Sequence, residues 1–127
     1  MRLLLDTQIF LWSLDRVARL PSVAREAIET ADNAVLVSAV VIWEIAIKAS
    51  VGRLEFPPAD LRRLPRLIET AGFAELPVLA RHAAGVQALP WHHRDPFDRL
   101  LVAQARDEGL TLVTVDPAIR AYDVLVL

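Results

Sequence analysis

The clearest indication of the fold is the segment Arg2-Leu3-Leu4-Leu5-Asp6-Thr7, at the amino end of the chain. Its three leucines form a short run that is apolar at every position, which is typical of a strand covered on both faces of a parallel sheet. Asp6 ends this run far short of the roughly 7–15 apolar residues in the core of a signal peptide. We therefore expect a strand, with an acid at its carboxyl end.

The rest of the chain alternates between apolar runs and longer amphipathic segments. Further strands are predicted at Val35–Val37, Leu110–Val115 and, as an edge strand, Val124–Leu127. Helices are predicted at Thr7–Ser13, Ser22–Thr30, Ala39–Val51, Ala59–Ala71, Ala80–Leu89 and Pro96–Glu108. This alternation predicts a three-layer α/β/α domain with a central, mostly parallel sheet of four to five strands.

The composition narrows the possible functions. With 127 residues the chain fits one domain, in which roughly residues 52–72 are interpreted as a helical excursion standing somewhat apart from the sheet. The formal charge of −2 does not indicate a general polyanion binder. The absence of cysteine excludes disulfides and thiolate chemistry, so Asp, Glu and His remain as strong metal ligands. We expect a cytoplasmic protein without a membrane span, and the mean hydropathy of +0.37 indicates apolar surface for a partner.

Two acids follow predicted strands directly. Asp6 follows Leu3–Leu5, and Asp116 follows Leu110–Val115. Ligands of open α/β folds bind outside the carboxyl ends of the strands, which favours a binding role. Helix capping is the alternative, because Asp116-Pro117 matches an N-cap followed by a first-turn proline. For either acid alone, both interpretations remain open.

Glu44 lies on the predicted helix Ala39–Val51, whose other positions are mostly apolar. On a helical projection it falls among apolar side chains, where an ionised carboxylate is costly unless a cation or hydrogen bonds compensate it. The alternative is a pair with Lys48 one turn away, worth only about 0.2–0.5 kcal/mol on an isolated helix. This favours a cation site.

Asp98 gives a similar signal in the segment Asp95-Pro96-Phe97-Asp98-Arg99. Capping explains Asp95 well, since a first-turn proline follows it, and Asp98 can occupy a capping-box position. Asp98 nevertheless projects on the same side as Leu101 and Val102. A second carboxylate is therefore expected to face the edge of the core.

If these four acids meet at one end of the sheet, their repulsion raises some pKa values unless a cation is bound. Carboxylates without cysteine suit Mg²⁺ or Mn²⁺ better than zinc. A metal site of this kind activates water and stabilises charge on a phosphoryl group, which predicts phosphodiester hydrolysis.

Histidines and tryptophans add weaker candidates. His92 and His93 are candidate ligands or general acids, although a loop histidine is more often a structural hydrogen-bonding group. His82 is interpreted as a surface residue. The three tryptophans are most simply core or interface residues: Trp12, Trp43 and Trp91.

At this point the sequence resembles PIN-domain ribonucleases, and specifically the VapC toxins of bacterial VapBC toxin–antitoxin modules. The order and spacing of several motifs carry the resemblance across almost the whole chain. They are Leu5-Asp6-Thr7, Val37-Ser38, Trp43-Glu44-Ile45 with Lys48, His93-Arg94-Asp95-Pro96-Phe97-Asp98-Arg99 with Ala103-Gln104-Ala105, and Thr111-Leu112-Val113-Thr114-Val115-Asp116.

The resemblance implies that Asp6, Glu44, Asp98 and Asp116 bind Mg²⁺ or Mn²⁺ for the cleavage of RNA. The residues it implies as accessory to the site are Asp95, Thr7, Thr114 and His93. It also implies a homodimer and a cognate VapB-type antitoxin, joined in a heterotetramer or larger assembly. The carboxy-terminal segment of such an antitoxin wraps the toxin and can place a basic side chain in the acidic site. DNA would be contacted only through the antitoxin.

Basic side chains are the candidates for contacts with RNA phosphates, which supply most affinity that does not depend on sequence. The candidates are Lys48, Arg53, Arg62, Arg63, Arg66, Arg94 and Arg99. Among the arginines of the helical excursion, Arg62 and Arg66 have a spacing that presents them together.

Two other functions fit parts of the sequence. One is a non-catalytic module of PIN-like fold that binds RNA or protein, against which the presence of all four acids argues. The other is a receiver-like domain with Asp6 or Asp116 as phosphoacceptor, which leaves Glu44 and Asp98 unexplained.

Overall fold

Four parallel strands form the centre of the molecule, in the order β3-β2-β1-β4. In this computed structural model, which describes all of residues 1–127, they are β1 (Arg2–Leu5), β2 (Ala34–Ser38), β3 (Ala74–Leu76) and β4 (Thr111–Val113). Leu4 of β1 pairs with Leu36 on one side and Leu112 on the other. Because β1 is central and covered on both faces, Leu3, Leu4 and Leu5 are fully buried. The predicted parallel α/β architecture is confirmed.

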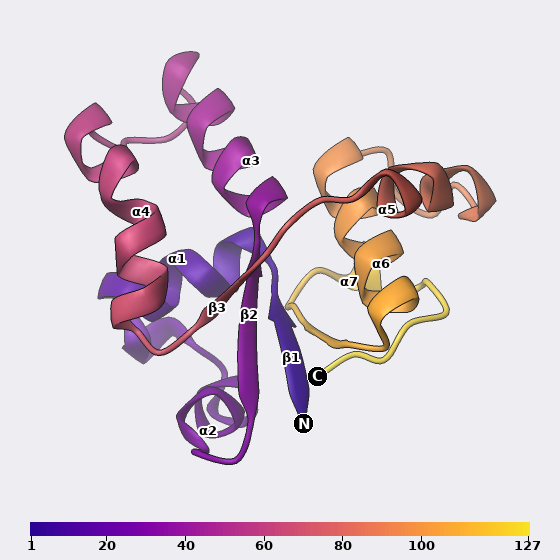
Figure 1. The fold of residues 1–127 in the computed structure, drawn as a ribbon, viewed down its shortest axis with the longest axis horizontal. Coiled ribbons are helices and arrows are strands. Elements are labelled where there is room, and N and C mark those ends of the chain that lie inside the picture. The colour runs from indigo at the N-terminus through magenta and orange to yellow at the C-terminus, as the bar shows by residue number, and fades with distance from the viewer.

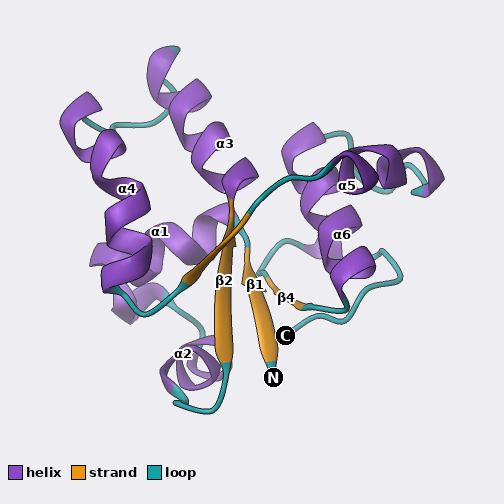
Figure 2. Ribbon diagram, viewed as in Figure 1, coloured by secondary structure: helices purple, strands orange, loops and turns teal.

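Helices flank this sheet, as Figure 2 shows. In the view of Figure 1, α1, α2 and α4 lie to the left of the strands and α5, α6 and α7 to the right. The helices are α1 (Thr7–Asp15), α2 (Ser22–Glu29), α3 (Ala39–Ser50), α4 (Pro58–Thr70), α5 (Ala80–Gly85), α6 (Pro96–Glu108) and α7 (Pro117–Arg120), with short 3-10 turns η1 (Val17–Arg19) and η2 (Val86–Ala88). None of them is long and apolar enough to cross a membrane.

The helix of the predicted excursion does not stand apart from the sheet. Together α3 and α4 form the connection between β2 and β3, and α4 packs against β3 and α3. Leu64 and Ile68, four residues apart, form one face of α4 that is almost completely buried in the core. The arginines of α4 lie on its exposed side. The buried apolar face, and not the arginines, therefore determines where the helix packs.

Two strands differ from the prediction. Strand β3 was not predicted, because Ala74 and Glu75 are exposed and the strand lacks a buried apolar run. The predicted edge strand Val124–Leu127 is reduced to a single parallel bridge between Leu112 and Val126. Strand β4 ends at Val113, and the residues up to Asp116 continue as a loop that leads into α7.

Candidate metal centre

A pocket of about 440 Å³ lies at the carboxyl edge of the sheet. It is lined by the four acids that the sequence predicts as ligands: Asp6, Glu44, Asp98 and Asp116. Asp6 follows β1, Glu44 lies on α3 after β2, Asp98 is in the first turn of α6, and Asp116 lies in the loop after β4. Because the strands are parallel, their carboxyl ends bring residues distant in sequence to one edge.

Asp6 and Asp116 both cap helices and face the pocket. Asp6 Oδ1 accepts a hydrogen bond from the Ile9 N–H at 2.8 Å, and Asp116 Oδ1 accepts one from the Ala118 N–H at 2.9 Å. Each carboxylate keeps a second oxygen for other partners. Capping and cation binding are therefore compatible at these two positions.

Burial raises the pKa of Asp6 above its usual range, and the negative charges of Asp116 and Glu44 add to this effect. The hydroxyl of Thr114 and the Ile9 N–H act in the opposite direction, because they hydrogen-bond the charged form. Thr114 Oγ1 also accepts a hydrogen bond from the Asp116 N–H at 3.0 Å. The predicted accessory residue Thr114 thus connects two acids of the pocket.

Glu44 is buried, and both of its carboxylate oxygens have partners. Thr7 Oγ1 donates to Oε1 at 2.6 Å, and the Lys48 ammonium pairs with Oε2 at 2.5 Å. The hydrogen bond to Glu44 raises the pKa of Lys48 above its usual range. The pair with Lys48, considered above as an alternative to a cation site, exists and lies within the pocket itself.

Asp95 and Asp98 have different roles at the start of α6. Asp95 Oδ1 accepts from the N–H groups of Phe97 and Asp98, so Asp95 is the N-cap. Burial raises the pKa of Asp98 to about 7, with further contributions from the negative charges of Asp95 and Glu44. His93 partly offsets this shift. Asp98 is therefore the acid that most needs a neighbouring cation at neutral pH.

His93 lies between two of these carboxylates. Its Nε2 is 3.0 Å from Asp98 Oδ2 and 3.1 Å from Asp116 Oδ2. Its backbone N–H donates to the hydroxyl of Tyr122 at 3.0 Å, and that hydroxyl also accepts from Arg99. Sequence reasoning missed Tyr122, because a lone tyrosine near the end of the chain gives no sign of this contact.

The residues present fit a hard divalent cation. The pocket is lined by carboxylates from separate elements, and His93 Nε2, Asp98 Oδ2 and Asp116 Oδ2 lie close enough together to share one ion. Burial, with repulsion from the neighbouring acids, raises the pKa values of Asp6 and Asp98, and a cation here would stabilise their charged forms. The carboxylate oxygens of this set are typical ligands of Mg²⁺ or Mn²⁺.

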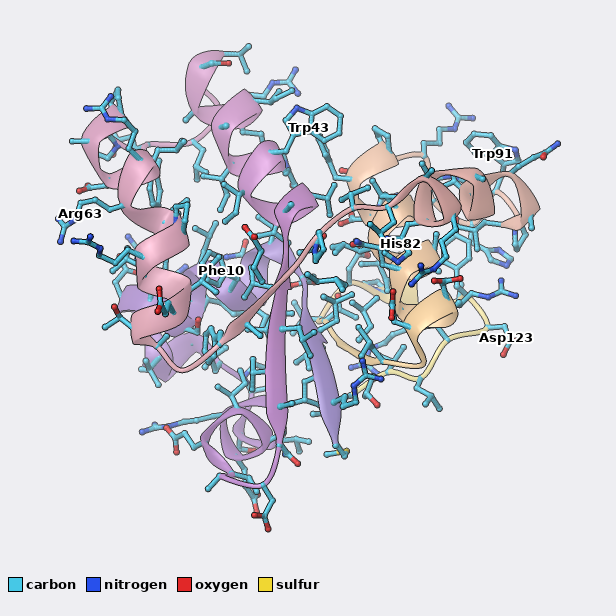
Figure 3. All side chains as sticks on the ribbon, in the orientation of Figure 1. Phe10, Trp43, Arg63, His82, Trp91 and Asp123 are labelled. Atoms are coloured by element: carbon cyan, nitrogen blue, oxygen red, sulfur yellow. The ribbon has the colours of Figure 1, made fainter.

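The predicted phosphate contacts separate into three groups. Lys48 and Arg53 line the acid pocket, and Arg94 is exposed in the loop that precedes α6. Arg62 and Arg66 are exposed on α4 but do not line this pocket. Arg63, also exposed on α4 in Figure 3, lines a neighbouring cavity of about 530 Å³ that shares Gln8, Leu11 and Leu54 with the acid pocket.

Arg99 is not available to RNA, and this prediction is wrong. Its side chain is buried, and its guanidinium donates to the carbonyl of Pro90 at 2.9 Å and to the hydroxyl of Tyr122 at 3.0 Å. It also donates to the Val86 carbonyl and lies under the ring of Trp91. Arg99 therefore holds together the loop that leads to His93.

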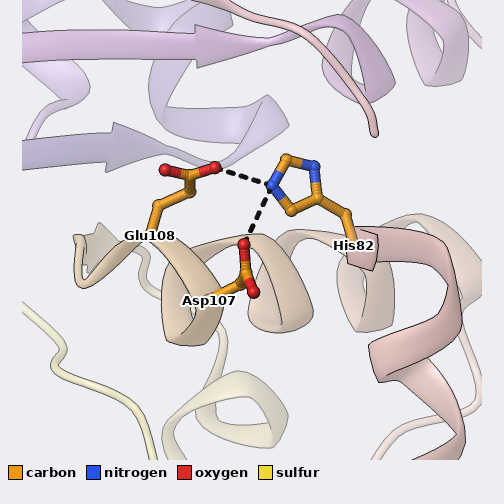
Figure 4. Close-up of side chains that lie close together, drawn as sticks. All are labelled: His82, Asp107 and Glu108. Carbon is orange, nitrogen blue, oxygen red and sulfur yellow. Dashed lines mark hydrogen bonds and ion pairs between the residues drawn. The ribbon is translucent and has the colours of Figure 1, made fainter. Parts of the chain in front are cut away.

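His82 was expected at the surface, but it is fully buried. Figure 4 shows its ring beside Asp107 and Glu108, with Nε2 at 3.4 Å and 2.9 Å from their oxygens. Arg81 forms ion pairs with both acids at 2.6 Å, so its guanidinium already compensates their charge. The hydrogen bond from His82, followed by Arg81, lowers the pKa of Glu108. This group joins α5 to α6 and lies away from the acid pocket.

The tryptophans are less buried than a core role requires. Trp43 and Trp91 are 53% and 77% exposed, and both lie on the outside of the fold in Figure 3. Trp43 packs edge-on against Phe97 of α6, with ring centroids 4.9 Å apart. Trp12 is half-buried and packs on the core.

Comparison with known proteins gives consistent matches. Residues 3–125 match the PIN domain family. Ribonuclease VapC22 of Mycobacterium tuberculosis (strain ATCC 25618 / H37Rv) is 34% identical over 123 residues, which is 94% of this chain and 90% of that protein.

Solved structures share the fold. The toxin–antitoxin complex VapBC2 from Rickettsia felis, bound to a promoter DNA fragment, contains a chain that aligns with a TM-score of 0.74 at 16% identity, covering 100% of this chain and 98% of that one. VapBC-1 from nontypeable Haemophilus influenzae aligns with a TM-score of 0.63 at 16% identity, covering 100% and 97% of the two chains.

Proposed function

The chain belongs to the PIN domain family as a VapC-type nuclease, and on this premise we propose that it is the toxin of a toxin–antitoxin module and cleaves RNA with Mg²⁺ or Mn²⁺. One observation carries the proposal. Four carboxylates from separate elements, Asp6, Glu44, Asp98 and Asp116, line a single pocket at the carboxyl edge of the sheet. A fold stabilised only by capping would not need Glu44 in this place.

Asp6, Asp98 and Asp116 would hold the metal through their free oxygens. When bound there, the ion would lower the pKa of a water and stabilise charge on the scissile phosphate. Asp6 and Asp116 are held by their caps to Ile9 and Ala118, so their free oxygens are oriented before the ion arrives. Such preorganisation avoids the cost of ordering ligands on binding.

The remaining polar side chains of the pocket orient the acids and contact the substrate. Thr7 holds Oε1 of Glu44, and Thr114 holds Asp6 and the backbone of Asp116. Lys48 and Arg53 supply positive charge at the wall of the same pocket, where the other charged residues are all carboxylates. These two residues are therefore the best placed to bind the RNA backbone.

The partner follows from the same family membership. A VapB-type antitoxin would neutralise the toxin by covering the acid pocket, whose excess of carboxylates suits a basic side chain. The toxin would act as a homodimer in a heterotetramer or larger assembly, in the cytoplasm, and would contact DNA only through the antitoxin. Exposed apolar residues such as Trp43 on α3 and Val51, which follows its last residue, are consistent with further contacts between chains.

The function can be tested by incubating the purified chain with total cellular RNA and sequencing the new RNA ends. We expect cleavage at defined sites with Mg²⁺ or Mn²⁺ and none for Asp98→Asn. The sequenced ends would also identify the target, since tRNA and ribosomal RNA both fit a toxin that stops translation. If neither metal supports cleavage of any RNA while the chain still binds RNA, the protein is a binding module instead.

A further inference from the structure

We propose that His93 is a direct ligand of the metal, so that the site combines an imidazole nitrogen with carboxylate oxygens and favours Mn²⁺ over Mg²⁺. This inference rests on the proposed function, because it concerns the same pocket. It extends that function by assigning to His93 the role of a metal ligand, where the sequence leaves a ligand, a general acid and a structural hydrogen-bonding group open.

The first argument is the spacing of the donor atoms. Nε2 of His93 is 3.0 Å from Asp98 Oδ2 and 3.1 Å from Asp116 Oδ2. Neighbouring ligands on an octahedral ion with bonds of ~2.1 Å are about 3.0 Å apart. His93 Nε2 thus already lies, from each of the two oxygens, at the separation of adjacent ligands on one ion, and the candidate ligand atoms all lie within 4.8 Å of one another.

The second argument is which oxygens are free. Asp116 Oδ1 is engaged by the Ala118 N–H, so Oδ2 is the oxygen left for a cation, and this is the atom that His93 contacts. Glu44 differs, because Thr7 and Lys48 engage both of its oxygens. His93 therefore lies at the part of the pocket where a metal has uncommitted carboxylate oxygens to bind.

The third argument is the rigid mounting of His93. Its backbone N–H is held by Tyr122, whose hydroxyl receives a hydrogen bond from Arg99 at 3.0 Å. Arg99 is 3% exposed and also holds the carbonyl of Pro90, earlier in the same loop. A buried arginine and a buried tyrosine thus fix the loop, as is typical of supports behind a metal ligand.

The fourth argument is the weak hydrogen bond at the other ring nitrogen of His93, Nδ1. For Nε2 to bind a metal, the neutral ring must carry its proton on Nδ1, which in this structure accepts only a long bond of 3.3 Å from the Asp95 N–H. The change of tautomer gives up this weak contact and the Nε2–H hydrogen bonds to Asp98 and Asp116. The bonds of Nε2 and of the two carboxylate oxygens to the ion would replace them.

His82 provides an internal comparison, since it also faces two carboxylates. Its Nδ1 accepts a bond of 2.9 Å from the Leu79 N–H, which fixes the proton on Nε2. Arg81 already supplies the positive charge to those carboxylates at 2.6 Å. At His93 the bond to Nδ1 is longer, at 3.3 Å, and no arginine or lysine forms an ion pair with Asp98 or Asp116. Of the two histidines, His93 is therefore the better placed to become a ligand.

An imidazole ligand changes the choice of metal. Mg²⁺ binds mainly oxygen and keeps much of its water, whereas first-row transition metals accept imidazole. We therefore expect the chain to bind Mn²⁺ more tightly than Mg²⁺, and this preference to depend on His93.

The test uses the purified full chain and Mn²⁺ without any RNA. Calorimetric titration measures the affinity, and pulsed electron paramagnetic resonance detects ¹⁴N coupled to the bound Mn²⁺. His93→Gln keeps an N–H donor near the carboxylates but removes the imidazole. His92→Gln is the matched control, because His92 is the exposed neighbour of His93.

We expect a directly coordinated ¹⁴N signal in the wild type and in His92→Gln, and its loss in His93→Gln. The affinity of His93→Gln for Mn²⁺ should fall at least about tenfold, the loss seen even when a partner of a ligand is removed. Its affinity for Mg²⁺ should fall less. Circular dichroism spectra and melting curves of all variants show whether each is folded.

Absence of the nitrogen signal in the wild type, or unchanged Mn²⁺ affinity in folded His93→Gln, would overturn the inference and leave His93 as a hydrogen-bonding residue. Asp98→Asn separates this result from failure of the proposed function. If Asp98→Asn abolishes Mn²⁺ binding while His93→Gln does not affect it, the acid site stands and only the role of His93 is wrong. If the wild type binds Mg²⁺ but no Mn²⁺, only the inference on His93 fails. If it binds neither ion, both proposals fail.

Discussion

Asp6 directly follows β1, Asp116 lies in the loop after the neighbouring strand β4, and each uses one carboxylate oxygen to cap the helix that follows. Each of these side chains is therefore both a structural residue and a candidate metal ligand. The cap fixes the carboxylate, and the second oxygen remains for other partners. Substitutions that keep the cap and remove the charge can separate the two roles.

The first prediction concerns metal binding by Asp116. Asparagine caps helices about as well as aspartate, so Asp116→Asn should fold and melt close to the wild type without metal. Saturating Mn²⁺ should raise the melting temperature of the wild type, because a ligand that binds only the folded state stabilises it. The shift should be much smaller in Asp116→Asn, as differential scanning calorimetry would measure. An equal shift in both proteins would exclude Asp116 as a ligand.

The second prediction concerns pH. Burial raises the pKa of Asp98 from 3.8 to about 7, so between these values the folded protein holds a proton that the unfolded chain has released. The free energy of unfolding of the metal-free protein should therefore fall as the pH rises from about 4 to 7. The raised pKa of Asp6 acts in the same direction.

Urea unfolding in EDTA at several pH values measures this dependence. Asp98→Asn should remove much of it and should be more stable than the wild type at pH 8, since it carries no buried charge. A stability of Asp98→Asn that falls as steeply as that of the wild type would show that Asp98 is not the titrating group.

The third prediction concerns the pair of Lys48 with Glu44. Lys48→Met should lower the free energy of unfolding by about 1 kcal/mol, since the Lys48 side chain is 38% exposed and solvent weakens the pair. In the background of Glu44→Gln the same substitution should cost less, because the buried carboxylate is gone. A double-mutant cycle in urea measures the coupling, and a coupling of zero would contradict the contact.

The fourth prediction concerns Tyr122, whose hydroxyl accepts hydrogen bonds from Arg99 and from the His93 N–H. Tyr122→Phe leaves these donors without a partner in a buried place, which costs about 1–3 kcal/mol. It should also loosen the loop that carries His93, and so raise the rate of amide hydrogen exchange at residues 91–95. His92→Ala, which removes only a ring beside Tyr122, is the control and should leave that exchange rate nearly unchanged.

The acids of the pocket were predictable because their signals are local. A carboxylate directly after an apolar strand, or on an apolar helix, is unusual in the sequence itself, and parallel strands bring such positions together. The sequence signals for the start and the end of α6 are equally local. Asp95 caps its start, and Gly109 ends it with a φ of +66° that favours glycine.

The buried polar residues were not predictable in the same way. Arg99 and His82 look like surface residues, because a charged or polar side chain is usually solvated. Their partners, Tyr122 and Glu108, are 23 and 26 residues away in sequence. The packing of α5 on α6 brings His82 to Glu108, and the packing of α7 on α6 brings the segment with Tyr122 to Arg99. The packing of α4 was also hard to predict from the sequence. Its arginines make the segment look exposed, although one face of the helix is buried.

The central claim is that the acid pocket cleaves RNA with the help of a divalent metal. Its most direct test compares the wild type and Asp6→Asn, purified identically, on one RNA substrate with Mn²⁺ and with EDTA. Asparagine at position 6 retains the cap to Ile9, so both proteins should be folded. The account predicts cleavage only by the wild type and only with metal. Cleavage by the wild type in EDTA, or undiminished cleavage by Asp6→Asn with Mn²⁺, would contradict it.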